Sequence, residues 1–72
     1  MPKPQKYQDV IKVLRENGWV LLRQGSGDHE LSGIPGATSQ NNKHSIPRHR
    51  DISAGVIGDL IKKLPNTPSN WR

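Results

Sequence analysis

The sequence predicts a single α+β domain in which two helices lie on one face of a three-stranded antiparallel sheet. Three observations support this class: an apolar stripe at helical spacing near each end, three short strand-like segments between the stripes, and turn residues at the junctions. A chain of 72 residues is one domain, close to the size at which a single core only just outweighs chain entropy. We therefore expect one domain over residues 1–64 and a C-terminal tail over residues 65–72.

The first helix is predicted over residues 6–17. Charged and polar side chains occupy most of one helical face, whereas the other face carries Tyr7, Val10, Ile11 and Leu14. Gly18 follows at the position where a left-handed residue ends many helices. The helix therefore has both an apolar face for the core and a defined end.

Three strands are expected over residues 19–24, 28–34 and 44–48. The first is rich in strand-forming residues and should be buried on at least one face, with Trp19 in the core rather than stacked on a base. Glycines at 25 and 27 break it and connect it to the second, antiparallel strand. Residues 35–43 are polar and long for a hairpin, so we expect a mobile loop there. Pro47 has no N–H and places the third strand at a sheet edge.

The second helix begins after Ser53, a typical N-cap residue, and ends before Pro65. Its apolar stripe consists of Ile57, Leu60, Ile61 and Leu64. Gly55 and Gly58 each weaken the helix by about 1 kcal/mol relative to alanine. They are either poor helix residues or sites where a partner approaches closely. In the tail, Trp71 is the one residue able to pack back on the domain.

Composition limits the classes of function. Eleven Lys and Arg against six Asp and Glu give a formal charge of +5, which favours nucleic acid first and acidic protein surfaces second as partners. The absence of Cys excludes a disulfide framework and a thiolate zinc site. With no apolar leader and no apolar stretch long enough to span a bilayer, we expect a cytoplasmic protein without a membrane partner.

Three histidines are the only side chains that titrate near neutral pH. His29 follows a glycine-rich turn at the start of the second strand, where it is either an ordinary surface residue or a general acid or base. Asp28 and Glu30 flank His29, but strand alternation directs them to the opposite face, where we expect solvated charges. His44 and His49 are too few for a metal site, so we expect structural roles for both, no metal and no cofactor.

Candidate phosphate contacts surround this histidine in the sequence. The turn offers backbone amides that no large side chain covers, and a basic stretch from Lys43 to Arg50 is either a solvated edge or a phosphate-contact strip. The candidate RNA-binding residues are Arg23, Gly25, Ser26, Gly27, Lys43, Arg48, His49 and Arg50.

The order helix, strand, strand, strand, helix is shared with double-stranded-RNA-binding domains. Local motifs give a more specific resemblance, carried by Lys6-Tyr7-x-x-Val10-Ile11-x-x-Leu14, Gly18-Trp19, Arg23, the glycine turn with His29, Pro35-Gly36, Ile46-Pro47-Arg48-His49 and Ile57-x-x-Leu60-Ile61. In this order and spacing, roughly residues 6–64 resemble the HicA family of mRNA interferase toxins. The chain departs from the family pattern by one extra residue before the histidine and by a longer stretch between Pro35 and Pro47. It also has Ser32 where the family often has an aromatic residue after the histidine.

The resemblance implies a double-stranded-RNA-binding-like fold and a metal-independent endoribonuclease toxin that acts on mRNA. It also implies one essential histidine on the second strand, which is His29 here, and a HicB-type antitoxin as partner. We expect that antitoxin to cover the His29 face and the basic strip from Lys43 to Arg50. Two other classes remain open: a non-catalytic double-stranded-RNA-binding module, and a protein-interaction domain derived from an inactive toxin.

Overall fold

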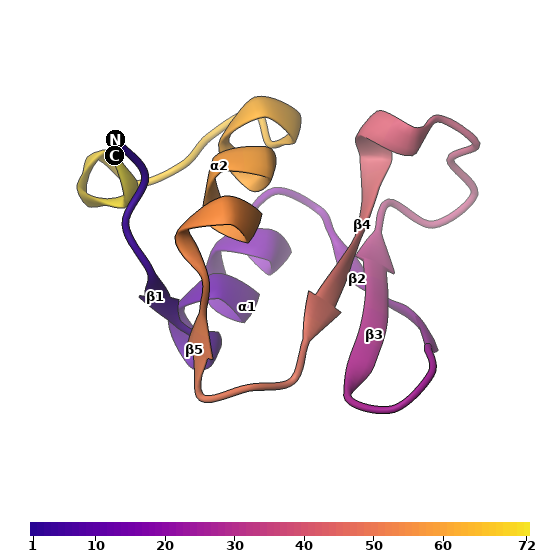
Figure 1. Cartoon of the computed structure of the whole chain (residues 1–72). Coiled ribbons are helices and arrows are strands. Elements are labelled where there is room, and N and C mark those ends of the chain that lie inside the picture. The colour runs from indigo at the N-terminus through magenta and orange to yellow at the C-terminus, as the bar shows by residue number, and fades with distance from the viewer.

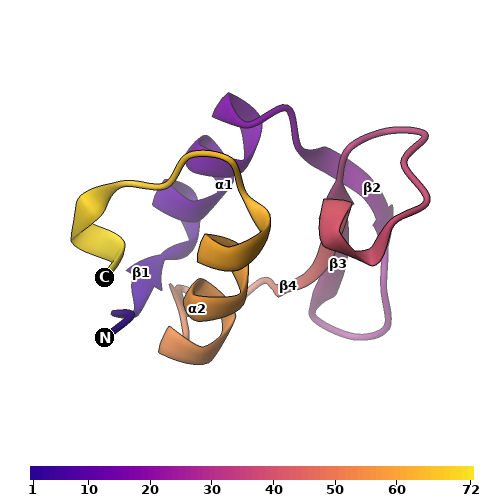
Figure 2. The ribbon, with the colours of Figure 1, turned by 90° about the horizontal axis from the view of Figure 1, so that it is seen from above.

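The computed structural model describes residues 1–72 and contains two helices beside a three-stranded antiparallel sheet (Figure 1). The helices lie on the same side of that sheet (Figure 2). This confirms the predicted α+β class. The elements in chain order are β1 (Gln5–Lys6), α1 (Tyr7–Glu16), β2 (Val20–Gln24), β3 (His29–Gly33), β4 (Lys43–Pro47), β5 (Asp51–Ile52) and α2 (Ala54–Lys63), with 3₁₀ turns at Gln40–Asn42 and Ser69–Trp71.

The C-terminal end of α1 and the start of α2 both lie where the sequence predicts. Gly18 has φ of 81°, a left-handed conformation that glycine adopts without strain, and it directly follows the C-cap of α1. The hydroxyl oxygen of Ser53 accepts a hydrogen bond from the Val56 amide at 3.4 Å and caps α2. Each helix has ten residues, and neither is long and apolar enough to cross a membrane.

The main sheet has the strand order β2-β3-β4 with antiparallel neighbours. Pro47 therefore lies on an edge strand, as predicted. Glu30 pairs with Ile46, and since Ile46 is fully buried in the core, this face of the sheet is turned toward the helices. His29 pairs with Pro47 on the opposite, outer face.

The polar connection between β3 and β4 contains more regular structure than its composition indicates. Ile34 donates its amide to the carbonyl of Asn42 at 2.9 Å, which closes the loop at its base. Residues 40–42 form the 3₁₀ turn, capped by the Ser39 hydroxyl, and β4 already begins at Lys43. The third strand therefore starts one residue earlier than expected.

The expectation that the first strand is buried on at least one face is wrong. All five residues of β2 are exposed, and Val20, Leu21 and Leu22 are 44%, 52% and 36% accessible. The reason is topological. β2 is one edge strand of the sheet, and the only residue of this sheet in the core is Ile46 of β4, the strand at the other edge. The core consists of Val10, Val13, Leu14, Trp19, Ile46, Ile52, Ile57, Leu60, Leu64 and Trp71.

The C-terminal segment is part of the packed domain rather than a tail. Trp71 is 1% exposed, and its carbonyl accepts a hydrogen bond from the Lys3 amide at 2.9 Å, so the two termini lie together (Figure 1). Trp19 is also 1% exposed, which confirms its predicted core position. A second sheet, in which Gln5 pairs with Ile52, joins the N-terminal segment to β5. Strands of two residues carry no sequence pattern, so none was predicted.

Candidate nucleic-acid interface

The glycine-rich turn holds His29 at the first position of β3. The Gly25 amide donates to the His29 carbonyl at 2.9 Å, and the His29 amide donates to the Ser26 carbonyl at 3.2 Å. Gly27 has φ of 58°, which favours glycine. A Cβ atom at Gly25 would lie only 3.2 Å from the His29 carbonyl oxygen, so a larger residue at this position would require a small shift of the backbone. The turn therefore fixes the backbone of His29 through contacts on both sides.

The His29 side chain is exposed on the outer sheet face, where its Nδ1 lies 3.2 Å from the Ser45 hydroxyl. This hydrogen bond orients the ring by one nitrogen, and Nε2 makes no hydrogen bond to the protein. An imidazole held in this way presents Nε2 to solvent, where a bound substrate can exchange a proton with it.

Asp28 joins the turn to the segment that follows β4. Its backbone carbonyl accepts from the Arg48 amide at 2.6 Å, and its carboxylate lies 3.6 Å from Nε2 of His49. Asp28 is exposed, as predicted, but its side chain faces His49 rather than solvent alone. Asp28 thus places His29 and the basic residues 48–50, which are far apart in the sequence, beside each other.

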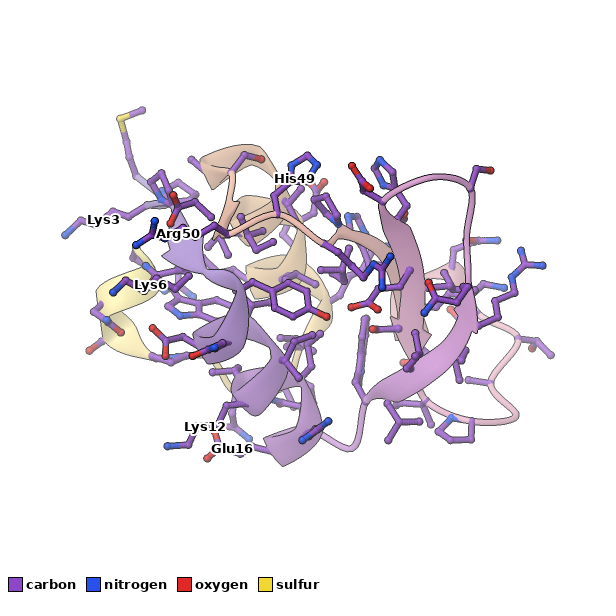
Figure 3. The ribbon with its side chains drawn as sticks, turned by 90° about the horizontal axis from the view of Figure 1, so that it is seen from below. Lys3, Lys6, Lys12, Glu16, His49 and Arg50 are labelled. Atoms are coloured by element: carbon purple, nitrogen blue, oxygen red, sulfur yellow. The ribbon has the colours of Figure 1, made fainter.

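A basic cleft lies between this segment and the start of α1. It has a volume of about 430 Å³ and is lined by Lys6, Tyr7, Gln8, Arg48, His49 and Arg50. Figure 3 shows Lys6, Arg50 and Lys3 gathered at one end of this face, with His49 nearer the sheet. The contribution of Lys6 was missed from the sequence, because it depends on β1 pairing with β5, where Lys6 lies opposite Asp51.

One wall of the cleft is formed by Tyr7, whose hydroxyl donates a hydrogen bond to the Glu30 carboxylate. Glu30 is only 5% exposed, so the expectation that it is a solvated charge is wrong. It lies on the helix-facing side of β3, beneath the first turn of α1. Burial raises the pKa of Tyr7 to about 12, helped by the hydrogen bond and the charge of Glu30, so the hydroxyl remains a donor to more alkaline pH than that of an unperturbed tyrosine.

Among the candidate RNA-binding residues, the turn residues 25–27 and two basic residues, Arg23 and Lys43, do not line the basic cleft. Arg23 pairs with Leu31, so it shares the outer sheet face with His29 at a diagonal position. Lys43 pairs with Gly33 at the opposite end of β4 from Pro47, a separation of about 13 Å along the strand. The predicted strip from Lys43 to Arg50 is therefore not continuous, and only its end at residues 48–50 adjoins His29.

His44 has structural contacts. Its Nδ1 lies 2.9 Å from Nζ of Lys63, and its Nε2 lies 3.8 Å from the Asp59 carboxylate, both on α2. Burial and the Lys63 charge lower the pKa of His44, although Asp59 opposes this, so the neutral ring is favoured as acceptor for Lys63. No group of three or more His, Cys, Asp or Glu side chains comes together in a way that could hold a metal ion.

No protein-family model, curated protein or solved structure matches this chain. The chemistry of the site therefore has to follow from its own groups. An exposed imidazole, an open glycine turn and three nearby cationic side chains, Lys6, Arg48 and Arg50, form a surface suited to a phosphodiester backbone.

Proposed function

We propose that this chain is a metal-independent endoribonuclease of the HicA toxin type, with a double-stranded-RNA-binding-like fold, in which His29 is the general acid or base. The observation that carries the proposal is the contact between the two halves of the site. Arg48 donates its amide to the Asp28 carbonyl at 2.6 Å, which brings the basic segment 48–50 beside the turn that bears His29. The proposal requires a phosphodiester held by these cations to reach His29, whose side chain is exposed beside this segment.

The proposed reaction is an intramolecular transesterification of RNA. The ribose 2′-oxygen loses its proton and bonds to the adjacent phosphorus, while the bond from phosphorus to the 5′-oxygen breaks and that oxygen receives a proton. The products are a 2′,3′-cyclic phosphate and a free 5′-hydroxyl. His29 either removes the first proton or supplies the second. Arg23, Arg48 or Arg50 stabilises the additional negative charge on the phosphorane-like transition state, together with the amides of Ser26 and Gly27; the Gly25 amide already donates to the His29 carbonyl.

The partner that we propose is a HicB-type antitoxin with an acidic surface that covers His29 and the adjoining residues 48–50. Lys43 is left out of this contact because it lies at the far end of β4. A neighbouring reading frame for a short acidic protein is the expected source of the partner. A complex in which both His29 and residues 48–50 stay open to RNA contradicts this arrangement.

A non-catalytic RNA-binding module is the alternative, and one observation favours it. The cleft lined by Lys6, Arg48 and Arg50 does not include His29 among its lining residues, so phosphate binding there needs no imidazole. Such a module binds RNA with a steep salt dependence, because it releases counterions from several phosphates, but leaves the RNA intact. A protein-interaction domain shows neither behaviour.

The test is the chemistry of the products formed by the purified chain on RNA in excess EDTA. We expect fragments that end in 2′,3′-cyclic phosphate, and no cleavage of the same sequence made with 2′-O-methyl riboses, which lack the attacking hydroxyl. Intact RNA together with salt-sensitive binding supports the binding module instead. Intact RNA without salt-sensitive binding supports the interaction domain.

A further inference from the structure

The outer edge of β2 is an unusual surface for a small basic domain. Three consecutive residues, Val20, Leu21 and Leu22, are exposed. The strand β2 pairs with β3 on one side and with no strand on the other. An edge strand presents unpaired backbone N–H and C=O groups that form hydrogen bonds readily with an added strand. Three consecutive exposed aliphatic residues do not protect such an edge, because no charge lies between them.

A groove runs between this strand and α1. It has a volume of about 110 Å³, and its apolar lining includes Ile11, Leu14, Trp19 and Leu21. The indole Nε1 of Trp19 is buried and has no hydrogen-bond partner. The groove therefore has room for a small apolar side chain.

The charge around the groove selects its occupant. Arg15 lines it, and Arg23 follows the aliphatic residues in β2. The one acidic residue of the lining, Glu30, is 5% exposed and already accepts a hydrogen bond from the Tyr7 hydroxyl. A second copy of this chain would bring another +5 to the same edge, which disfavours self-pairing. RNA has no side chains that bury leucine and valine. An acidic polypeptide complements both the apolar residues and the cations.

We propose that the β2 edge and the groove beside α1 form a docking surface for an extended, acidic segment of a partner protein. The segment adds a strand to β2. Its apolar side chains on the helix-facing side contact Leu21 and enter the groove, and its carboxylates on the outer side face Arg23. The register shift between Leu21 and Arg23 is typical of a β-bulge, so the added strand pairs over only a few residues. The inference does not depend on cleavage of RNA.

The test is a titration of the isotope-labelled full chain by nuclear magnetic resonance. The probe is a capped seven-residue peptide in which valine and glutamate alternate, and the control peptide has lysine in place of glutamate. We expect the acidic peptide to shift the amides of residues 20–24 and the Trp19 indole N–H, and to slow hydrogen exchange along β2. The lysine peptide should bind about tenfold more weakly or worse.

A pair of variants separates the groove from general charge effects. Leu21→Glu places a carboxylate on the half-exposed edge and should weaken binding of the acidic peptide by about tenfold. Ser69→Glu makes the same change of charge at an exposed residue of the C-terminal 3₁₀ turn, and should leave binding close to the parent value. That turn, drawn in yellow, lies far from the β2-β3-β4 sheet (Figure 1). The proposal is overturned if the β2 signals stay fixed at millimolar peptide, if only residues 48–50 respond, or if β2 signals change with protein concentration alone.

Discussion

Tyr7 and Glu30 form a hydrogen bond that links the basic cleft to the interior of the fold. The carboxylate is nearly fully buried, and the Tyr7 hydroxyl is the only side-chain donor that reaches it. A buried carboxylate without a donor is strongly unfavourable, so this hydrogen bond fixes both the first turn of α1 and the wall of the cleft. The hydrogen bond to Glu30 thereby holds the Tyr7 ring against β3, and Tyr7 and Arg48 both line the cleft.

Because Tyr7 is the only tyrosine, its titration can be followed directly by the near-ultraviolet absorbance of phenolate. We expect a pKa of about 12 in the folded chain against 10.0 for an unperturbed tyrosine. The folded value lies above the unfolded one, so the hydroxyl contributes stability that is complete below pH 10 and is lost as the pH rises toward 12. Tyr7→Phe removes this alkaline dependence and lowers the free energy of unfolding by about 1–3 kcal/mol at neutral pH.

A folded chain whose tyrosine titrates near pH 10 contradicts this account.

The residues themselves show why the sequence predicts the position of His29 but not the burial of Glu30. The glycine turn and the strand after it lie within one short segment, so the position of His29 follows from local pattern. The burial of Glu30 depends on Tyr7, which lies 23 positions earlier in the chain and is placed over β3 only by tertiary packing.

At the scale of the elements, two glycines have opposite roles. Gly33 ends β3 where the chain of the β3–β4 loop returns against it, and a Cβ there would meet the Asn42 carbonyl oxygen and lie 2.7 Å from Cβ of Lys43. Gly55 lies in the first turn of α2, where the nearest atom to an added Cβ is the Ser53 hydroxyl oxygen at 3.9 Å. Close approach at Gly58 is made by this chain's own Pro2, whose Cγ lies 3.2 Å from an added Cβ.

Alanine substitution should therefore change stability in opposite directions at these two positions. We expect Gly33→Ala to lower the free energy of unfolding by about 1–3 kcal/mol, since the backbone on both sides must shift. Gly55→Ala should raise it by about 0.5–1 kcal/mol, because alanine fits the helix and restricts the unfolded chain. Urea denaturation of both variants measures the difference, and equal midpoints for the two would contradict the described packing of the loop against β3.

The elements also show where sequence patterns stop being informative. Gly18, Ser53 and Pro65 are local signals, and the helices begin and end within one residue of the predicted limits. The composition of β2 indicates a strand but not its place in the sheet, so its exposure was not predictable. The pairing of β1 with β5 joins segments too short to show alternation.

On the scale of the whole molecule, the two ends of the chain complete one core. Trp71 packs into it from the C-terminal 3₁₀ turn, and the side chain of Asn17 accepts from the Asn66 amide at 2.9 Å and donates to the Asn66 carbonyl at 2.8 Å. These bonds tie the segment after α2 to the end of α1. The expected division into a domain over residues 1–64 and a tail therefore separates parts that pack together.

Trp71→Ala should lower the free energy of unfolding by about 3–5 kcal/mol, because it leaves a large cavity in a domain with few other core residues. Small domains have a total stability of about 5–15 kcal/mol, so we expect a large fall in the melting temperature or loss of the cooperative transition. Circular dichroism during heating measures this. The matched control is Arg72→Ala, an exposed neighbour, and a tryptophan variant that melts like this control would show that the C-terminal segment is dispensable.

The central claim is that His29, presented by the glycine turn beside residues 48–50, moves a proton during RNA cleavage without a metal ion. The most direct measurement is the single-turnover cleavage rate of single-stranded RNA in excess EDTA for the parent, His29→Ala and His44→Gln, with folding checked by circular dichroism. We predict that His29→Ala slows cleavage by about 100-fold or more. His44 lies on the other face of the sheet, so the His44→Gln variant should cleave RNA at close to the parent rate. A His29→Ala chain that cuts RNA as fast as the parent would contradict the assignment.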